Sequence, residues 1–96
     1  GSNIRLDLPI TLDEAVLGGK VRVPTLDGAV ELNIPANTSG GRTFRLKGKG
    51  LPDKTGKGDL LATIRIVLPE QNDSDLQALM EKWRETRADD PRKIFG

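Results

Sequence analysis

The sequence from Arg42 to Pro69 reads RTFRLKGKGLPDKTGKGDLLATIRIVLP, and this stretch decides the fold. Phe44 and Leu46 alternate with polar residues, which is the period-two pattern of a half-buried strand. The run from Leu60 to Leu68 also alternates, and it is long, rich in branched residues and almost free of charge. Such a run is typical of a central strand in a sheet. The stretch therefore predicts two strands joined by a glycine-rich connection.

The connection reads GKGLPDKTGKGD, and its four glycines and one proline exclude a helix. A long hairpin connection is one interpretation. A phosphate-cradling loop is the other, because lysines are interleaved with the glycines. A P-loop needs Lys-Ser or Lys-Thr directly after its glycines at the start of a helix, whereas these glycines lead into a strand. The pattern therefore favours the hairpin connection.

The N-terminal part predicts an edge strand followed by a short helix. Apolar residues alternate from Ile4 to Ile10, and Pro9 places this strand at an edge or a strand end because proline cannot donate a ladder hydrogen bond. We expect the helix from Thr11 to Gly18, where Thr11 and Glu14 have the spacing of a capping box. Two glycines then end the helix.

A hairpin is expected next in the chain. Val21 and Val23 alternate with charged residues, and the run from Val30 to Ile34 supplies a second strand. Asp27-Gly28 between them is a strong hairpin signal. With about five strands that each carry one apolar face, the sequence predicts a mainly β fold, namely a small β-sandwich with one short inserted helix and a C-terminal helix.

The residues after Pro69 change character, so we expect a β-domain over residues 4–69 and a helical appendage over 70–96. Asp73 or Ser74 caps a helix that is expected to run to about Ala88. Its apolar residues fall at i, i+3, i+4 and i+7, and this narrow face either folds back on the sandwich or contacts a partner across a two-fold axis. The face, which is the candidate dimerisation site, consists of Leu76, Leu79, Met80 and Trp83.

Composition narrows the classes of function. The chain has 96 residues, with 15 basic and 14 acidic side chains, so its net charge demands neither nucleic acid nor a membrane. It has no histidine and no cysteine, which removes the commonest general base, disulfides and most zinc sites. The carboxylates are scattered over turns, caps and strand faces. The sequence therefore predicts no enzyme activity, no metal and no cofactor.

The sequence gives no indication of a membrane span or of a secretion signal. No apolar run approaches the ~18–20 residues of a membrane span, and no signal peptide is visible. Together with the lack of cysteine, this pattern predicts a cytoplasmic protein. Gly1 and Ser2 resemble a tag-cleavage scar, so we expect the chain to be a piece of a longer protein.

A run of basic side chains, interrupted only by Asp53, lies within the stretch from Arg42 to Pro69. A solvated strand face that discourages edge pairing is one interpretation. Contact with an acidic partner or with DNA phosphates is the other, although the interleaved aromatic residues of single-strand binders are missing. The candidate contact residues are Arg42, Arg45, Lys47, Lys49, Lys54 and Lys57.

Three stretches resemble one family: LDLPITLDEAVLGGKVRVPTLDG, VELNIPANTSGGRTFRLKGKGLP and GKGDLLATIRIVLP. Together they look like the second C-terminal β-domain of DnaJ-type co-chaperones. The class without the cysteine-rich zinc module, which includes curved-DNA-binding members, is the closer match. The resemblance covers Ile4 to Pro69, with its motifs in the order and spacing of the family.

The resemblance implies a domain that helps to hold unfolded polypeptides and to deliver them to a DnaK-type chaperone, with the following segment forming a homodimer. The J-domain that stimulates DnaK carries a His-Pro-Asp loop, so a chain without histidine does not contain it. A DNA-contacting role of the curved-DNA-binding kind is the alternative function.

The family also suggests where a client peptide binds. The homologous upstream domain binds extended peptide beside the strand that follows its short helix. Val21 and Val23, near Ala62, hold the comparable place here, and strand addition with shallow apolar pockets is the expected mechanism. Ordinary core residues are the competing interpretation of these three side chains.

Overall fold

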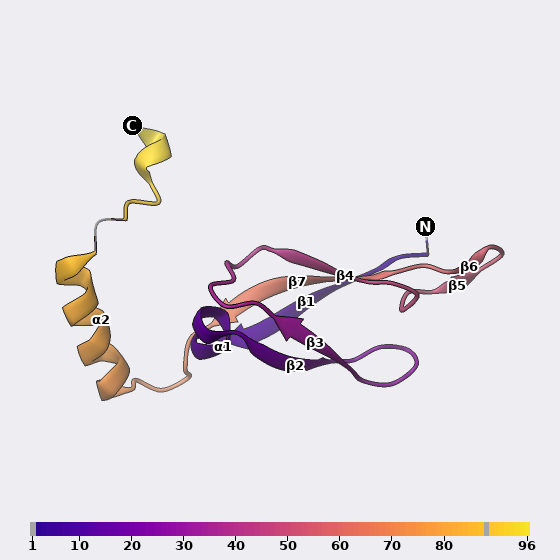
Figure 1. Ribbon diagram of the computed structural model, residues 1–96, viewed down its shortest axis with the longest axis horizontal. Helices are drawn as coiled ribbons and strands as arrows, with labels where there is room; N and C mark the ends of the chain where they lie inside the picture. Colours follow the sequence, from indigo (N-terminus) through magenta and orange to yellow (C-terminus); the bar gives the residue numbers. More distant parts are fainter. Residues whose placement is uncertain (1, 88) are drawn as a thin grey trace.

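The computed structural model describes residues 2–87 and 89–96, so Gly1 and Ala88 lie outside the described residues. Figure 1 shows an elongated molecule, with the strands in one body and a helix projecting beyond one end of it. In chain order the elements are β1 (Ile4–Thr11), α1 (Leu12–Leu17), β2 (Gly19–Val23), β3 (Val30–Ile34), β4 (Thr43–Leu46), β5 (Pro52–Asp53), β6 (Gly56–Lys57), β7 (Leu60–Val67), α2 (Ser74–Thr86) and the short 3₁₀ helix η1 (Lys93–Phe95).

The larger sheet is built around β7, which confirms the predicted central strand. Its order is β1-β7-β4. β1 runs parallel to β7, from the pair Ile4 and Leu60 onward. β4 runs antiparallel on the other side, with Phe44 opposite Ala62. Pro9 lies in β1, an edge strand, as the sequence predicts.

The smaller sheet is the predicted hairpin of β2 and β3, which pair from Gly19 and Ile34 to Val23 and Val30. The turn between them spans residues 24–29, so it is longer than the two-residue turn that Asp27-Gly28 favours. Gly28 still takes the positive φ of 105° that suits glycine at such a turn.

One apolar core lies between the two sheets, which confirms the mainly β fold. Alternate residues of β1 and β7 point into it, as period-two alternation requires. α1 contributes a single buried side chain, Ala15. The core consists of Leu8, Ile10, Ala15, Val23, Ile34, Leu60, Ala62 and Ile64.

Both helices begin where their capping residues predict. The backbone N–H of Thr11 donates to Oε1 of Glu14 over 2.9 Å, which is the reach-back bond of a capping box. Asp73 caps α2 by accepting from the N–H groups of Asp75 and Leu76, at 3.0 and 3.1 Å. α2 ends at Thr86, slightly before the predicted end.

The glycine-rich connection between β4 and β7 is a long hairpin excursion, as the sequence favours. It holds the two-residue strands β5 and β6, which pair with each other in an antiparallel way. Figure 1 shows this small hairpin at the end of the sandwich opposite α1.

Replacing Ile64 with alanine tests the central position of β7. Ile64 is 1% exposed in the core, so the Ile64→Ala variant should lose about 2–5 kcal/mol of unfolding free energy through lost burial and a cavity. Urea denaturation followed by circular dichroism measures the loss. The matched control is Ile94→Ala, because Ile94 is 84% exposed and its removal should change stability by about 0.5 kcal/mol or less. Equal effects of the two variants would contradict the assigned core.

Candidate functional site

The apolar face of α2 is exposed. None of the residues of α2, all of which the structure describes, is buried. Leu79 is 57% exposed and Trp83 is 53% exposed, while Leu76 and Met80 are partly covered. Large apolar side chains gathered on one helix face and open to water are typical of an interaction surface.

α2 does not fold back over the sandwich. The radius of gyration is 17.1 Å, whereas a compact domain of this length has about 12.5 Å. Figure 1 shows α2 standing away from the sheets, beyond the end that carries α1. The sandwich therefore closes its core without α2, and the exposed face is free to contact something else.

An open apolar groove of about 920 Å³ lies between α2 and the end of the sandwich. α1 and the residues that follow β7 form one wall, and the apolar face of α2 forms the other. All charged residues that line it are acidic: Asp13, Glu70 and Asp73. Its apolar lining consists of Leu12, Val16, Leu17, Val67, Leu68, Leu76, Leu79, Met80 and Trp83.

Sequence reasoning found the α2 wall of this groove and missed the α1 wall. α1 has only six residues, and four of them are apolar. Residues of a helix are 100° apart, so a stripe that spreads over adjacent positions cannot turn every side chain toward one sheet. Ala15 takes the buried place, and Val16 and Leu17 remain exposed. A short helix that is apolar almost all round is the signal that could have indicated this second wall.

The basic run of the central stretch is divided by tertiary contacts. Arg45 forms an ion pair with Asp59 at 3.0 Å, and Lys57 forms one with Asp27 at 2.7 Å. The guanidinium of Arg42 lies over the ring of Phe44, with 4.7 Å between its central carbon and the ring centroid. These three basic residues are thus engaged within the chain.

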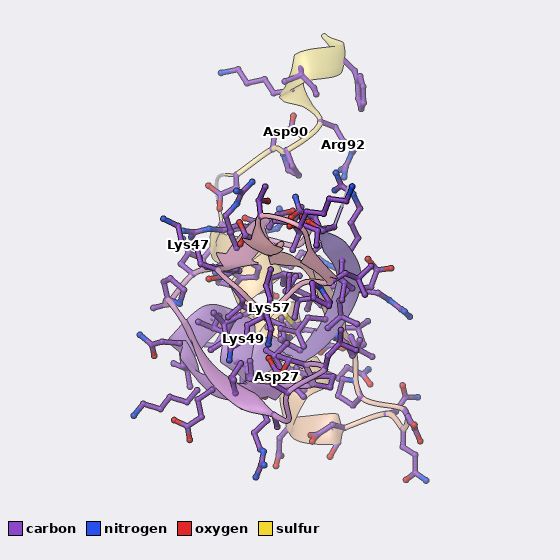
Figure 2. All side chains as sticks on the ribbon, turned by 90° about the vertical axis from the view of Figure 1, so that its right-hand side faces the viewer. Asp27, Lys47, Lys49, Lys57, Asp90 and Arg92 are labelled. Atoms are coloured by element: carbon purple, nitrogen blue, oxygen red, sulfur yellow. The ribbon has the colours of Figure 1, made fainter. Side chains whose placement is uncertain are left out.

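Lys47, Lys49 and Lys54 make no ion pair with any residue that the structure describes. Figure 2 looks onto the loop end of the molecule and shows Lys49 and Lys57 next to Asp27, with Lys47 farther out. The hydrogen bond and the charge of Lys57, with a smaller effect of Lys49, lower the pKa of Asp27. Lys49 therefore adds positive charge beside the ion pair of Lys57 and Asp27.

The three residues predicted to contact peptide lie in different environments. Val23 and Ala62 are 0% exposed and belong to the core, so their side chains are closed to a peptide in this structure. Val21 is partly exposed on β2. β2 pairs only with β3, which leaves its other edge without a strand among the described residues. A peptide beside β2 would thus reach that edge and Val21.

Two classes of site are missing from the described part of the chain. No group of three or more His, Cys, Asp or Glu side chains there is placed to hold a metal ion. Within residues 2–87 and 89–96, no helix is long and apolar enough to cross a membrane. What the described chain offers to other molecules is apolar surface, a free sheet edge and a few lysines.

Comparison with known proteins gives a family match over most of the chain. The family model described as DnaJ C terminal domain matches residues 1–69. The chaperone protein DnaJ 2 of Cutibacterium acnes is 48% identical over 88 residues, which are 90% of this chain and 23% of that protein. The chaperone protein DnaJ of Natronomonas pharaonis is 45% identical over 87 residues, or 88% of this chain and 23% of that protein.

A relative with a different name matches over the full chain. The curved DNA-binding protein of Escherichia fergusonii is 41% identical over 97 aligned residues, which cover 100% of this chain and 32% of that protein. The chain therefore spans 23% to 32% of the length of these three relatives.

Proposed function

Because the chain belongs to the DnaJ C-terminal domain family, we propose that it serves as the client-holding and dimerising part of a DnaJ-type co-chaperone. It works in the cytoplasm with a DnaK-type chaperone, through a J-domain that is not on this chain. The exposed apolar face of α2, continuous with the groove beside α1, is the observation that carries the dimerisation.

Burial of apolar surface drives this association. Each exposed Leu or Trp that leaves water contributes roughly 25 cal/mol per Å² of apolar area. A two-fold dimer places the same surface on both protomers, so the face of one α2 meets the groove beside the other. Trp and Met are enriched in interface cores, and Trp83 and Met80 lie on this face.

Charges on the α2 face should convert the dimer into a folded monomer. The Leu79→Glu, Trp83→Glu double variant places two carboxylates where association would bury them without a partner, which is costly. Sedimentation velocity should show a dimer for the unmodified chain and a monomer for the variant, with an unchanged circular dichroism spectrum. The control is Leu26→Glu, because Leu26 is 64% exposed in the β2–β3 turn, away from the groove. A monomeric unmodified chain at high concentration would refute the dimerisation.

Client holding uses the free edge of β2. An extended polypeptide can add there as a further strand, and main-chain hydrogen bonds then give an affinity that depends little on client sequence. Val21 supplies apolar surface beside that edge. This mechanism suits a protein that must accept many unfolded chains.

An apolar peptide should perturb the amide signals of β2. In a titration followed by ¹⁵N–¹H spectra, the largest shifts are expected between Gly19 and Val23, because new hydrogen bonds form at this edge. Val21→Glu should weaken binding several-fold, while Ala29→Glu in the adjacent turn should leave it unchanged. Shifts confined to other strands, or no shifts, would reject the β2 edge as the client site.

DNA contact is the second candidate function. It is supported by the relative named curved DNA-binding protein and by three lysines that make no ion pair among the described residues. Such contact would be non-specific, because lysines bind phosphates and carry no base readout here.

A salt series with duplex DNA tests the second candidate. The slope of log affinity against log salt should fall by about 0.9 for each phosphate contact that is removed. Replacing Lys47, Lys49 and Lys54 together with alanine should reduce this slope, while replacing Lys20, Lys82 and Lys93 should not. If the unmodified chain shows no salt-sensitive binding, the lysines are only a solvated surface.

A further inference from the structure

The family match begins at residue 1, so it includes Ser2, which the sequence alone suggests to be part of a tag-cleavage scar. The main chain at Ser2, where the chain enters the domain, lies in a notch between two glycines of the β4–β7 connection. A Cβ atom at Gly50 would come within 2.6 Å of the carbonyl oxygen of Ser2, and one at Gly58 within 2.6 Å of the carbonyl carbon of the same residue. Neither glycine has a positive φ. Glycine is therefore needed at both positions for space, so that another part of the backbone can approach closely.

Hydrogen bonds hold the entering chain in this notch. The N–H of Leu51 donates to the carbonyl oxygen of Ser2 over 2.7 Å. The N–H of Asp59 donates to Oδ1 of Asn3 over 2.8 Å, and the N–H of Ile4 donates to the carbonyl oxygen of Asp59 over 2.9 Å. Ser2, Asn3 and Ile4 are thus each held by a hydrogen bond at the start of β1.

The notch is itself rigidly built. The N–H of Gly50 donates to the carbonyl oxygen of Gly58 over 2.9 Å, and the N–H of Gly58 donates to that of Leu51 over 2.8 Å. These bonds close the base of the connection from which the β5–β6 hairpin extends. Because the two sides of the notch are bonded to each other, the notch is already ordered before the chain enters it. Binding of the chain therefore costs little further conformational entropy.

The β5–β6 hairpin adds a polar contact to the same segment. The hydroxyl of Ser2 donates to Oδ2 of Asp53 over 2.7 Å. This bond, together with those from Thr55, lowers the pKa of Asp53. Asp53 is therefore ionised at neutral pH and keeps its capacity to accept.

We propose that the contacts in the notch between Gly50 and Gly58 act as a strap: they hold the entering chain and fix the direction in which it enters β1. Any part of the protein that precedes Ser2 is then joined to this domain by a stiff junction. In a protein that holds clients, such a junction would set the angle between this domain and any domain that precedes it. Each of the two Gly-Lys-Gly runs of the connection thus supplies one glycine that leaves room for the entering main chain. This role is independent of the proposed dimerisation.

Alanine substitutions at a crowded and at an uncrowded glycine distinguish loss of the strap from the general effect of replacing glycine. Gly58→Ala should expel the entering chain, because its Cβ would overlap the backbone of Ser2. Gly40→Ala is the matched control, since its Cβ would meet nothing nearer than 3.9 Å and its φ is not positive. In Gly58→Ala, amide exchange at Leu51 should accelerate by about tenfold, the factor that corresponds to one lost hydrogen bond. Exchange at Ile64, in the core of β7, should stay slow in both variants.

A second variant keeps the proposal testable if Gly58→Ala does not fold. Asn3→Ala removes only an exposed side chain whose Oδ1 accepts from the N–H of Asp59. It should accelerate exchange at Asp59 and lower the ¹H–¹⁵N nuclear Overhauser effect of Ile4. The unmodified chain should show Asn3 as ordered as the middle of β1. A mobile Asn3 in the unmodified chain, or unchanged exchange at Leu51 and Asp59 in both variants, would overturn the strap.

Discussion

The pairing of β7 with strands on both sides is the constraint on which the whole domain depends. β1 lies parallel to it and β4 antiparallel, so every main-chain group of its middle has a neighbour to bond with. Its alternate side chains, Leu60, Ala62 and Ile64, are then buried. A sheet of only three strands has one interior strand. Here that strand supplies three of the eight buried apolar residues in the part of the chain that the structure describes. The hairpin of β2 and β3 covers this surface, and the small core is complete.

Local patterns explain why much of this fold can be predicted from the sequence. Period-two alternation identifies β7, and the spacing of Thr11 and Glu14 identifies the start of α1. Asp73 does the same for α2. Each of these signals lies within a few residues, where backbone geometry alone relates side chains to one another. The apolar face of α2 could be read in the same way, because helical spacing fixes it.

The rest of the candidate site depends on residues far apart in the chain. Lys57 and Asp27 meet because two separate hairpins extend to the same end of the molecule, and no local pattern encodes that meeting. The burial of Val23 and Ala62 has the same origin. Alternation shows that one face of a strand is covered, but it does not show how completely the opposite sheet covers each position. Interpretation of these residues as a peptide surface followed from the family rather than from their surroundings.

The parallel pairing of β1 with β7 delays folding of the domain during its synthesis on the ribosome. Residue 4 pairs with residue 60, so β1, the first strand of the described domain, gains this partner only after β7, its last strand, has been synthesised. Contacts between such distant residues slow folding, because a long loop must close first. Until β7 emerges, the main-chain groups of β1 lack their strand partner, and the core between the two sheets lacks the side chains that β7 supplies. A domain whose relatives are named chaperones would itself pass through the vulnerable state from which chaperones protect other proteins.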